Sequence, residues 1–298
     1  MSEFDTNYKE EEILKAARLI SKDGEVKIVE RLLGGMSNYT YVVKIDGAKY
    51  VIRIPGQYGE LFVNRQEEKY NLEQVAKTGL VKESLYFNVD TGVKITSYIE
   101  GESLNNINVD EEVLRKIADT LKTLHTSNIK AFRDYDYIGR INEYERHVKH
   151  YDVRYIKLKG ALLNLIGRLN KLPRFFSHGD CQRSNFILGD DKKLYLVDYE
   201  YSGNASIYFD LGVFGYLNFP NAVKLAELYF ERKLTLNDLV LLHIVNLQQY
   251  VQWYTVARIK EEKGLSSKLG VDFAKIAERY LIEGANHLKE IEKLLRYN

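Results

Sequence analysis

The chain has 298 residues and a mass of 34.7 kDa, and 45% of its residues are hydrophobic, so it can bury a sizeable core and is long enough for two domains. Its 43 Lys and Arg residues nearly balance its 42 Asp and Glu residues, which argues against a nucleic-acid-binding surface. Its single cysteine, Cys181, excludes an internal disulfide and a multi-cysteine zinc site.

The first hundred residues alternate between helical and strand patterns. Apolar residues at helical spacing predict a helix over 10–21, and strand-like runs follow at 26–31, 39–45 and 50–54, the last two joined by Asp46 and Gly47. A helix over 64–78 and a hairpin of 85–89 and 93–99 come next. The polar, glycine-broken stretch 100–103 predicts a domain boundary. This order of elements predicts a small α+β domain over 1–100.

Beyond residue 110 the pattern becomes helical. Apolar residues recur at helical spacing over 113–124, 156–169, 223–232, 236–260 and 271–295. The runs 186–188 and 194–197 are typical of short buried strands on either side of a turn at 189–191. The sequence therefore predicts a larger, mostly helical domain over 101–298, interrupted by one hairpin.

That hairpin separates polar residues of the kind that phosphoryl transfer requires. A His-x-Asp-x4-Asn motif contains Asp180 and Asn185, and Asp198 follows thirteen residues after Asn185. In a kinase, one Asp accepts the proton of the attacking hydroxyl, while an Asn and a second Asp hold metal ions. A tight hairpin would bring Asn185 beside Asp198, and their oxygen atoms suit Mg²⁺. We therefore predict Asp180, Asn185 and Asp198 as catalytic residues, with the last two as metal ligands.

A glycine-containing loop lies between the first two predicted strands. Gly34 and Gly35 would let the backbone approach nucleotide phosphates, and Ser37 and Asn38 could donate hydrogen bonds from their side chains. A plain hairpin loop is the alternative for this segment. Its position between the first and second strands favours a phosphate-binding loop.

Arg53 is a cation in the middle of a strand-like run that is otherwise apolar. It falls on the face shared with Val51, and a buried cation needs a partner. Nucleotide phosphates and a helix carboxylate would supply one. Glu68 in the following helix is the preferred carboxylate and Glu67 the alternative. An edge strand with Arg53 in solvent is the competing interpretation.

These residues together resemble the aminoglycoside phosphotransferase and choline kinase superfamily, which has a protein-kinase-like fold and acts on small molecules. Within it, the runs Leu-Val-Asp-Tyr-Glu-Tyr-Ser-Gly at 196–203 and Phe-Asp-Leu-Gly at 209–212 are similar to choline/ethanolamine kinases, and most similar to the bacterial LicA-type choline kinases. The resemblance spans most of the chain. It implies a bilobal fold with a small antiparallel-sheet nucleotide-binding lobe over 1–100 and a larger helical lobe over 101–298 that carries the catalytic and acceptor sites.

The resemblance also assigns roles to individual residues. It implies ATP and Mg²⁺ as cofactors, Asp180 as the base, and Arg53 as a phosphate ligand at a position where protein kinases have Lys. The backbone from Ser97 to Ile99 would be the hinge that binds adenine. A kinase-like binding scaffold would have lost the base or a metal ligand, and none is missing.

Aromatic residues on one predicted helix suggest the acceptor. Tyr250, Trp253 and Tyr254 lie on one helical face, which is either core or a cage for a quaternary ammonium group, a cation that aromatic rings bind. We prefer a cage of Trp253 and Tyr254 with Tyr250 behind them and Glu200 supplying negative charge. We therefore predict a choline kinase that produces phosphocholine.

Two other acceptors stay open at this point. Ethanolamine is not securely separated from choline. An aminoglycoside is a larger polycation and would require several acidic groups, whereas 239–260 contains no Asp or Glu. The first residues lack the basic and then apolar order of a signal peptide, and no apolar run approaches about eighteen residues. We therefore expect a cytoplasmic protein with no transmembrane segment and no nucleic-acid partner, and leave its oligomeric state open.

Overall fold

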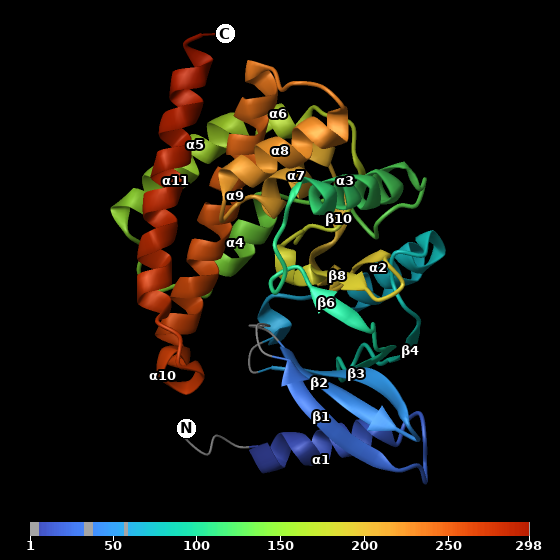
Figure 1. The fold of residues 1–298 in the computed structure, drawn as a ribbon. Coiled ribbons are helices and arrows are strands. Elements are labelled where there is room, and N and C mark those ends of the chain that lie inside the picture. The colour runs from blue at the N-terminus through green and yellow to red at the C-terminus, as the bar shows by residue number, and fades with distance from the viewer. Residues whose placement is uncertain (1–5, 33–37, 57–58, 298) are drawn as a thin grey trace. The chain divides into compact units, whose positions relative to one another are not determined.

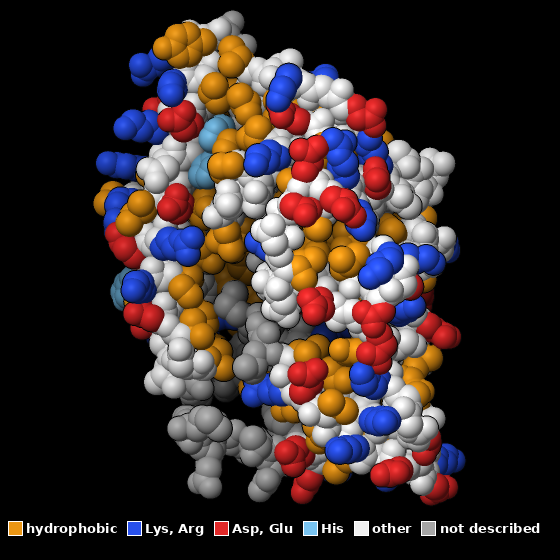
Figure 2. Space-filling model, in the orientation of Figure 1, with side chains coloured by type: hydrophobic (Ala, Val, Ile, Leu, Met, Phe, Trp, Pro, Cys, Tyr) orange, Lys and Arg blue, Asp and Glu red, His pale blue; other side chains and the backbone are white. Residues whose placement is uncertain are grey.

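The computed structural model describes residues 6–32, 38–56 and 59–297, and it divides into two compact units (Figure 1). The first unit comprises 1–108 and 184–201, and the second comprises 109–183 and 202–298. The assignment of nucleotide binding to 1–100 and of catalysis to 101–298 stays a prediction. No helix in the described part of the chain is long and apolar enough to cross a membrane. Basic and acidic side chains are interspersed over the face drawn in Figure 2.

The first unit contains an antiparallel five-stranded sheet with the order β1-β2-β3-β5-β4. Its elements are α1 (Thr6–Ala17), β1 (Val26–Leu32), β2 (Asn38–Ile45), β3 (Ala48–Pro55), α2 (Arg65–Val75), β4 (Ser84–Phe87) and β5 (Lys94–Ser97), with 3-10 turns at Gly59–Leu61 and Ala76–Thr78. The predicted strands and helices of this region are confirmed. The turn at Asp46 and Gly47 has φ values of 49° and 86°, which the tight hairpin between β2 and β3 requires.

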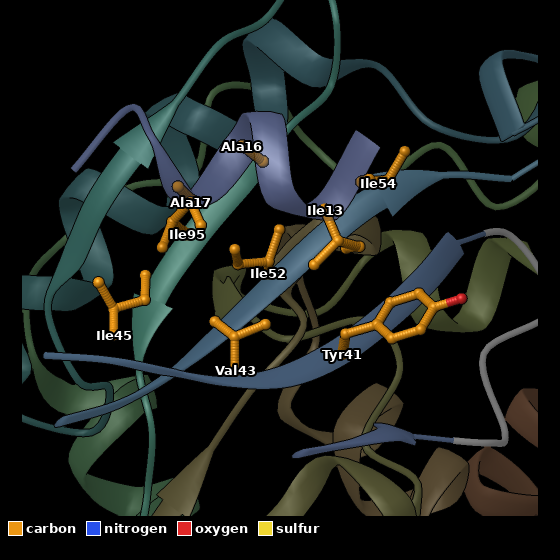
Figure 3. Packing of buried hydrophobic residues seen from close by; sticks show 9 residues of the cluster. All are labelled: Ile13, Ala16, Ala17, Tyr41, Val43, Ile45, Ile52, Ile54 and Ile95. Carbon is orange, nitrogen blue, oxygen red and sulfur yellow. The ribbon is translucent and has the colours of Figure 1, made fainter. Parts of the chain in front are cut away.

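Helix α1 covers one face of this sheet (Figure 3). Residues alternate along β2 and β3, so one face of the sheet presents apolar side chains to α1. The cluster comprises Ile13, Ala16, Ala17, Tyr41, Val43, Ile45, Ile52, Ile54 and Ile95. By the same alternation Arg53, between Ile52 and Ile54, belongs to the opposite face. The core packing on α1 therefore determines which side of the sheet carries the charged residue.

A second sheet of the first unit contains the predicted hairpin. Its strands are β6 (Gly101–Ser103), β8 (Phe186–Gly189) and β9 (Leu194–Leu196), in the order β6-β8-β9. We expected a polar boundary segment at 100–103, but 101–103 forms a strand because backbone pairing with β8 does not depend on apolar side chains. Gly101 has φ 156°, and a Cβ there would lie 2.2 Å from the carbonyl oxygen of Leu188. Only glycine fits this close approach.

The second unit is mostly helical. Its elements are α3 (Glu111–Thr126), α4 (Gly139–Glu145), α5 (Val153–Leu165), α6 (Gly167–Asn170), β7 (Phe175–Ser177), β10 (Gly203–Ala205), α7 (Ile207–Phe214), α8 (Phe219–Phe230), α9 (Leu236–Glu262), α10 (Leu265–Leu269) and α11 (Phe273–Leu295). The 3-10 turn Arg183–Asn185 begins at the last residue of 109–183 and continues into the first unit. Helix α9 is buried from Val240 to Ala257, and α4, α5, α7 and α11 all pack against it. Thr235 and Asp238 form a capping box at its start, which satisfies backbone N–H groups that the first turn leaves unpaired.

Candidate active site

The hairpin of β8 and β9 positions the predicted metal ligands in the first unit. The backbone N–H of Val197 donates to the carbonyl oxygen of Asn185 at 2.8 Å, so the residue before β8 lies beside the end of β9, as the spacing predicted. Asp198 follows directly, with φ 69°. This left-handed conformation is uncommon for a residue other than glycine and is a feature of functional sites.

Arg53 is buried on β3 and is not in solvent. Each of its two η nitrogens lies 2.7 Å from a carboxylate oxygen of Glu68, a bidentate pair. Nη1 also lies 3.2 Å from Oδ1 of Asp198 and 3.4 Å from Oε2 of Glu200. Glu68, and not Glu67, is therefore the partner of Arg53.

Two further cations contact these carboxylates, and the sequence patterns did not identify them. Nζ of Lys94, on β5, lies 2.8 Å from Glu68. Nη1 of Arg65, the first residue of α2, lies 2.8 Å from Glu68 and 3.3 Å from Glu200. We call this six-residue group the charged cluster: Arg53, Arg65 and Lys94 with Glu68, Asp198 and Glu200. Its three cations balance its three carboxylates.

Asn38 is the one predicted loop residue that lies within the described part of the chain. Its amide donates to Glu200 at 2.9 Å and accepts from Nη2 of Arg65 at 2.8 Å, so it links two members of the charged cluster. Gly34, Gly35 and Ser37 lie outside the described residues. Their role in phosphate binding stays a prediction.

Burial and neighbouring charges shift the pKa values of this cluster in opposite directions. Burial alone would raise the pKa of Glu68, but Lys94 and Arg53 outweigh it and hold that pKa well below the usual range. Burial, and then the neighbouring carboxylate of Asp198, raise the pKa of Glu200 to about 7 even though Arg53 and Arg65 oppose the shift. Glu68 is therefore ionised, whereas Glu200 titrates near neutral pH.

The donor atoms of the cluster fit a hard divalent cation. One carboxylate oxygen from each of Glu68, Asp198 and Glu200 lies within 4.8 Å of the others. Oxygen donors of this kind suit Mg²⁺, and close carboxylates gain from a cation that offsets their repulsion. Three cations hold Glu68, and Arg53 and Arg65 contact Glu200. Asp198, a predicted metal ligand, is therefore the carboxylate of this group that is best placed to bind the ion.

In the second unit, a buried aspartate holds the loop that contains Asp180. Asp210, on α7, accepts from the backbone N–H groups of His178 and Gly179, both at 2.9 Å. Nε2 of His125 lies 3.1 Å from Asp210, and Nδ1 of His125 lies 2.9 Å from the hydroxyl of Tyr229. Burial would raise the pKa of Asp210, but the hydrogen bond and charge of His125 lower it overall.

Asp180 itself is buried, and its side chain is oriented by its neighbours. The amide of Gln182 donates to Oδ1 of Asp180 at 2.6 Å, and the backbone N–H of Asp180 donates to Nδ1 of His178 at 3.2 Å. The adjacent Cys181 is fully buried, and burial raises the pKa of its thiol. Because a thiol is a poor nucleophile, Cys181 is a packing residue.

The predicted cage residues Tyr250, Trp253 and Tyr254 lie on α9, and all three are buried. The hydroxyl of Tyr254 accepts from the backbone N–H of Asp152 at 3.2 Å, and its ring stacks on Tyr155 at 4.7 Å between centroids. Nε1 of Trp253 donates to Gln249 at 2.9 Å. Tyr254 therefore has the contacts of a core residue, and the substrate role of these rings stays a prediction.

Tyr250 lies in a group of rings that the sequence did not reveal. Its ring centroid is 5.7 Å from that of Tyr216, 5.9 Å from that of Tyr280 and 5.5 Å from that of His287. These partners come from the region between α7 and α8 and from α11. Helical spacing within α9 could not identify rings contributed by other elements.

A separate polar cavity of about 330 Å³ lies in the second unit. Its lining includes Arg133, Tyr135, Asp136, Arg140, Glu143 and Ser202, and the hydroxyl of Ser202 donates to the carbonyl oxygen of His178 at 3.1 Å. The cavity therefore borders the loop that carries Asp180. Tyr250, Trp253 and Tyr254 are not among its lining residues.

The predicted adenine hinge follows β5. The backbone N–H of Ser97 donates to the carbonyl oxygen of Glu83 at 3.1 Å, and that of Tyr98 donates to the carbonyl oxygen of Lys49 at 3.3 Å. Ile99 is buried. The role of Ser97 and Ile99 in adenine binding stays a prediction.

A family model described as choline/ethanolamine kinase matches residues 29–219. The chain belongs to this family. It is therefore a small-molecule kinase and uses ATP. The matched span includes the charged cluster, the His-x-Asp-x4-Asn motif and Asp210, so the residues that the geometry brings together are the ones that the family model covers.

Known relatives agree with this assignment. Protein LicA of Haemophilus influenzae is 28% identical over 257 residues, which cover 78% of this chain and 73% of the relative. The crystal structure of LicA in complex with AMP is 27% identical, covers 94% of this chain and 98% of its own, and gives a TM-score of 0.77. Choline kinase LicA from Streptococcus pneumoniae has the same fold, with a TM-score of 0.77, 24% identity and coverage of 95% and 99%.

Proposed function

We propose that this chain is an ATP- and Mg²⁺-dependent choline kinase, which transfers the γ-phosphoryl group of ATP to the hydroxyl of choline and yields phosphocholine and ADP. The observation that carries the proposal is the family match over 29–219, because this span contains both the catalytic motif and the Asp-Tyr-Glu-Tyr sequence at 198–201. The description of the Streptococcus pneumoniae LicA as a choline kinase supports choline as the acceptor.

The charged cluster, apart from Glu200, would serve the nucleotide side of the reaction. Asp198 and Asn185 would hold Mg²⁺, which when bound offsets negative charge on the phosphate oxygens. Arg53 would bind a phosphate oxygen, since Glu68 fixes its guanidinium group in one orientation. Arg keeps its charge in a buried site better than Lys does, because its pKa is higher. Glu68 is then a positioning residue and not a ligand.

Asp180 would act as the base for the acceptor. As the choline oxygen forms its bond to phosphorus, its proton passes to the Asp180 carboxylate, and the bond between phosphorus and the β,γ-bridging oxygen of ATP breaks. Asp210 would act indirectly, since it holds the backbone of the preceding His178 and Gly179 through two hydrogen bonds. A base must be oriented toward its proton, and this support supplies the orientation.

The quaternary ammonium of choline would be bound by aromatic faces and negative charge. We retain Trp253 and Tyr254 with Tyr250 behind them, and Glu200 as the carboxylate, as part of this proposal. Ethanolamine is the second candidate, because the family includes ethanolamine kinases. A cage of rings favours choline, whereas an ethanolamine site would require hydrogen-bond acceptors for the ammonium N–H groups.

The proposal is tested by an ATP-consumption screen with choline, ethanolamine, an aminoglycoside and methylthioribose, with and without Mg²⁺. We expect ADP formation to depend on choline and on Mg²⁺, and mass spectrometry to identify phosphocholine as the product. The Asp180→Asn variant provides the background. Consumption with the aminoglycoside or methylthioribose and none with choline would overturn the proposal.

A further inference from the structure

One segment of the second unit has a large excess of basic residues. Residues 146–174 contain eight Lys and Arg residues and one acidic residue, Asp152, whereas the whole chain has a net charge of only +1. The eight are Arg146, Lys149, Arg154, Lys157, Lys159, Arg168, Lys171 and Arg174. The rest of the chain is therefore acidic, and this segment is a distinct basic surface.

The segment is built around α5 and α6, which follow one nearly continuous helical path. Ile166, between the two helices, has helical angles of φ −61° and ψ −24°. Tyr155, Leu158 and Leu162 form the buried side of α5, which packs against α9 and α11. In Figure 1, α5 runs next to α11, while apolar side chains on its other side are exposed.

The exposed side combines apolar and basic residues. Val153 is 62% exposed, Ile156 59% and Leu163 49%. At about 100° per residue these three lie on the helix face opposite the buried leucines, with Lys157 and Arg168 along one edge. We define the α5–α6 face as six residues: Val153, Ile156, Lys157, Leu163, Arg168 and Lys171. Single exposed apolar residues are ordinary, but three in one stripe beside cations require an explanation.

The cations of the α5–α6 face differ from the other basic residues of this segment. Within the described residues, Lys157, Arg168 and Lys171 are exposed and form no ion pair. The other basic residues nearby behave differently, since Arg154 pairs with Asp152 and Glu278, and Lys159 pairs with Glu145. Lys157, Arg168 and Lys171 can therefore bind negatively charged groups of a partner.

We propose that the α5–α6 face docks on an anionic phospholipid surface. A helix that lies in a lipid interface has an apolar stripe that enters the headgroup boundary and Lys or Arg residues at its edges that contact lipid phosphates. The α5–α6 face has both features, and its long basic side chains can extend toward the headgroups while their methylene groups remain apolar. Nucleic acid would require the cations but would leave Val153, Ile156 and Leu163 without a role.

The test is sedimentation of the full chain with vesicles at low salt. We expect binding to vesicles of phosphatidylglycerol and phosphatidylcholine in about equal parts, weaker binding as salt rises, and little binding to pure phosphatidylcholine vesicles. The pure vesicles also present choline headgroups, so they separate charge from headgroup recognition. Lys157→Gln/Arg168→Gln/Lys171→Gln should lower the partition coefficient roughly a hundredfold, since each cation near the membrane contributes about a factor of five.

Matched controls separate this face from the general properties of the protein. Lys27→Gln/Lys44→Gln/Lys289→Gln removes the same charge from other exposed positions and should bind nearly as the parent does. Ile156→Ser/Leu163→Ser should weaken binding, whereas Leu19→Ser/Leu217→Ser, at positions 50% and 56% exposed, should not. Circular dichroism and the thermal midpoint of each variant confirm that it is folded.

Three results would overturn the proposal. The first is a parent protein that does not sediment with the anionic vesicles. The second is equal loss of binding in the two triple variants, which would show that net charge alone acts. The third is tighter binding of an RNA oligonucleotide than of lipid, with RNA binding unchanged in Ile156→Ser/Leu163→Ser. That result would identify the α5–α6 face as a polyanion site.

Discussion

Replacing Glu68 by Gln tests the charge balance of the cluster. Glu68 is 0% exposed, and its two carboxylate oxygens lie 2.7 to 2.8 Å from nitrogens of Arg53, Arg65 and Lys94. Gln has nearly the same shape, so the change removes a charge without opening a cavity. The cluster would then have three cations and two carboxylates in a buried site. Loss of one partner of a buried ion pair costs about 3 to 5 kcal/mol, and we expect Glu68→Gln to lower the free energy of unfolding by this amount.

The assay is urea unfolding at pH 7, without nucleotide or metal, followed by far-UV circular dichroism. Glu67→Gln is the matched control, since it removes the same charge from the preceding residue of α2, which lies outside the charged cluster. We expect that control to cost less than about 1 kcal/mol, as exposed or partly exposed pairs do. Equal unfolding curves for Glu68→Gln and the parent, or an equal loss in Glu67→Gln, would refute the reasoning.

The stability difference between the parent and Glu68→Gln should also depend on pH. The pKa of Glu68 is lowered in the folded state, against the effect of burial, by Lys94 and Arg53. A lowered folded pKa stabilises the protein above the unfolded value of about 4.3, and this stabilisation is lost as the pH falls through the folded pKa. The difference between parent and Glu68→Gln should therefore be full at pH 7 and shrink at strongly acidic pH.

Three further predictions concern the reaction and its site. Asp180→Asn should lower kcat by at least about a hundredfold, the usual scale of general-base catalysis, with little change in ATP affinity; near-normal turnover would remove Asp180 from the mechanism. Because burial and Asp198 raise the pKa of Glu200 to about 7, the stability that its neutral form gives to the metal-free protein is lost as the pH rises through that value. Glu200→Gln should abolish this decline in urea unfolding, and a parent profile that is flat between about pH 5 and 8 would contradict the shift. Trp253→Ala should raise KM for choline about two- to thirtyfold with ATP parameters unchanged; a folded variant with unchanged KM would exclude this ring from the cage.

Sequence patterns predicted the local structure of the first unit well. Asp46 and Gly47 identified a tight hairpin by their conformational preference, and the apolar alternation along β3 showed which face Arg53 would occupy. A cation in such a strand needs a carboxylate, so Glu68 could be named in advance. The choice against Glu67 required the structure, because adjacent residues of one helix differ only in direction.

Other features depend on tertiary contacts that periodicity does not encode. Arg65 has the pattern of an exposed residue at a helix start, and its contact with Glu200 comes from the packing of α2 against the 3-10 turn Tyr199–Tyr201 after β9. Asp210 belongs to the Phe-Asp-Leu-Gly run that the sequence analysis quoted, and it is the one charged residue in the apolar run of α7, but its contacts with the loop of Asp180 required the structure. Its partner His125 could not be identified from the sequence, because the two are 85 residues apart. The exposed stripe on α5 was hidden for the same reason, since apolar spacing predicts a helix but not which face is covered.

The most direct test of the central claim is the ratio of kcat/KM for choline to that for ethanolamine, measured with saturating ATP and Mg²⁺. An aromatic cage gains from the three methyl groups of choline, and contacts of this size discriminate by about ten- to two-hundredfold. We predict a ratio of at least about ten in favour of choline. A ratio below one would show that the chain is an ethanolamine kinase, and turnover of neither amine would contradict the assignment of an amino alcohol as the acceptor.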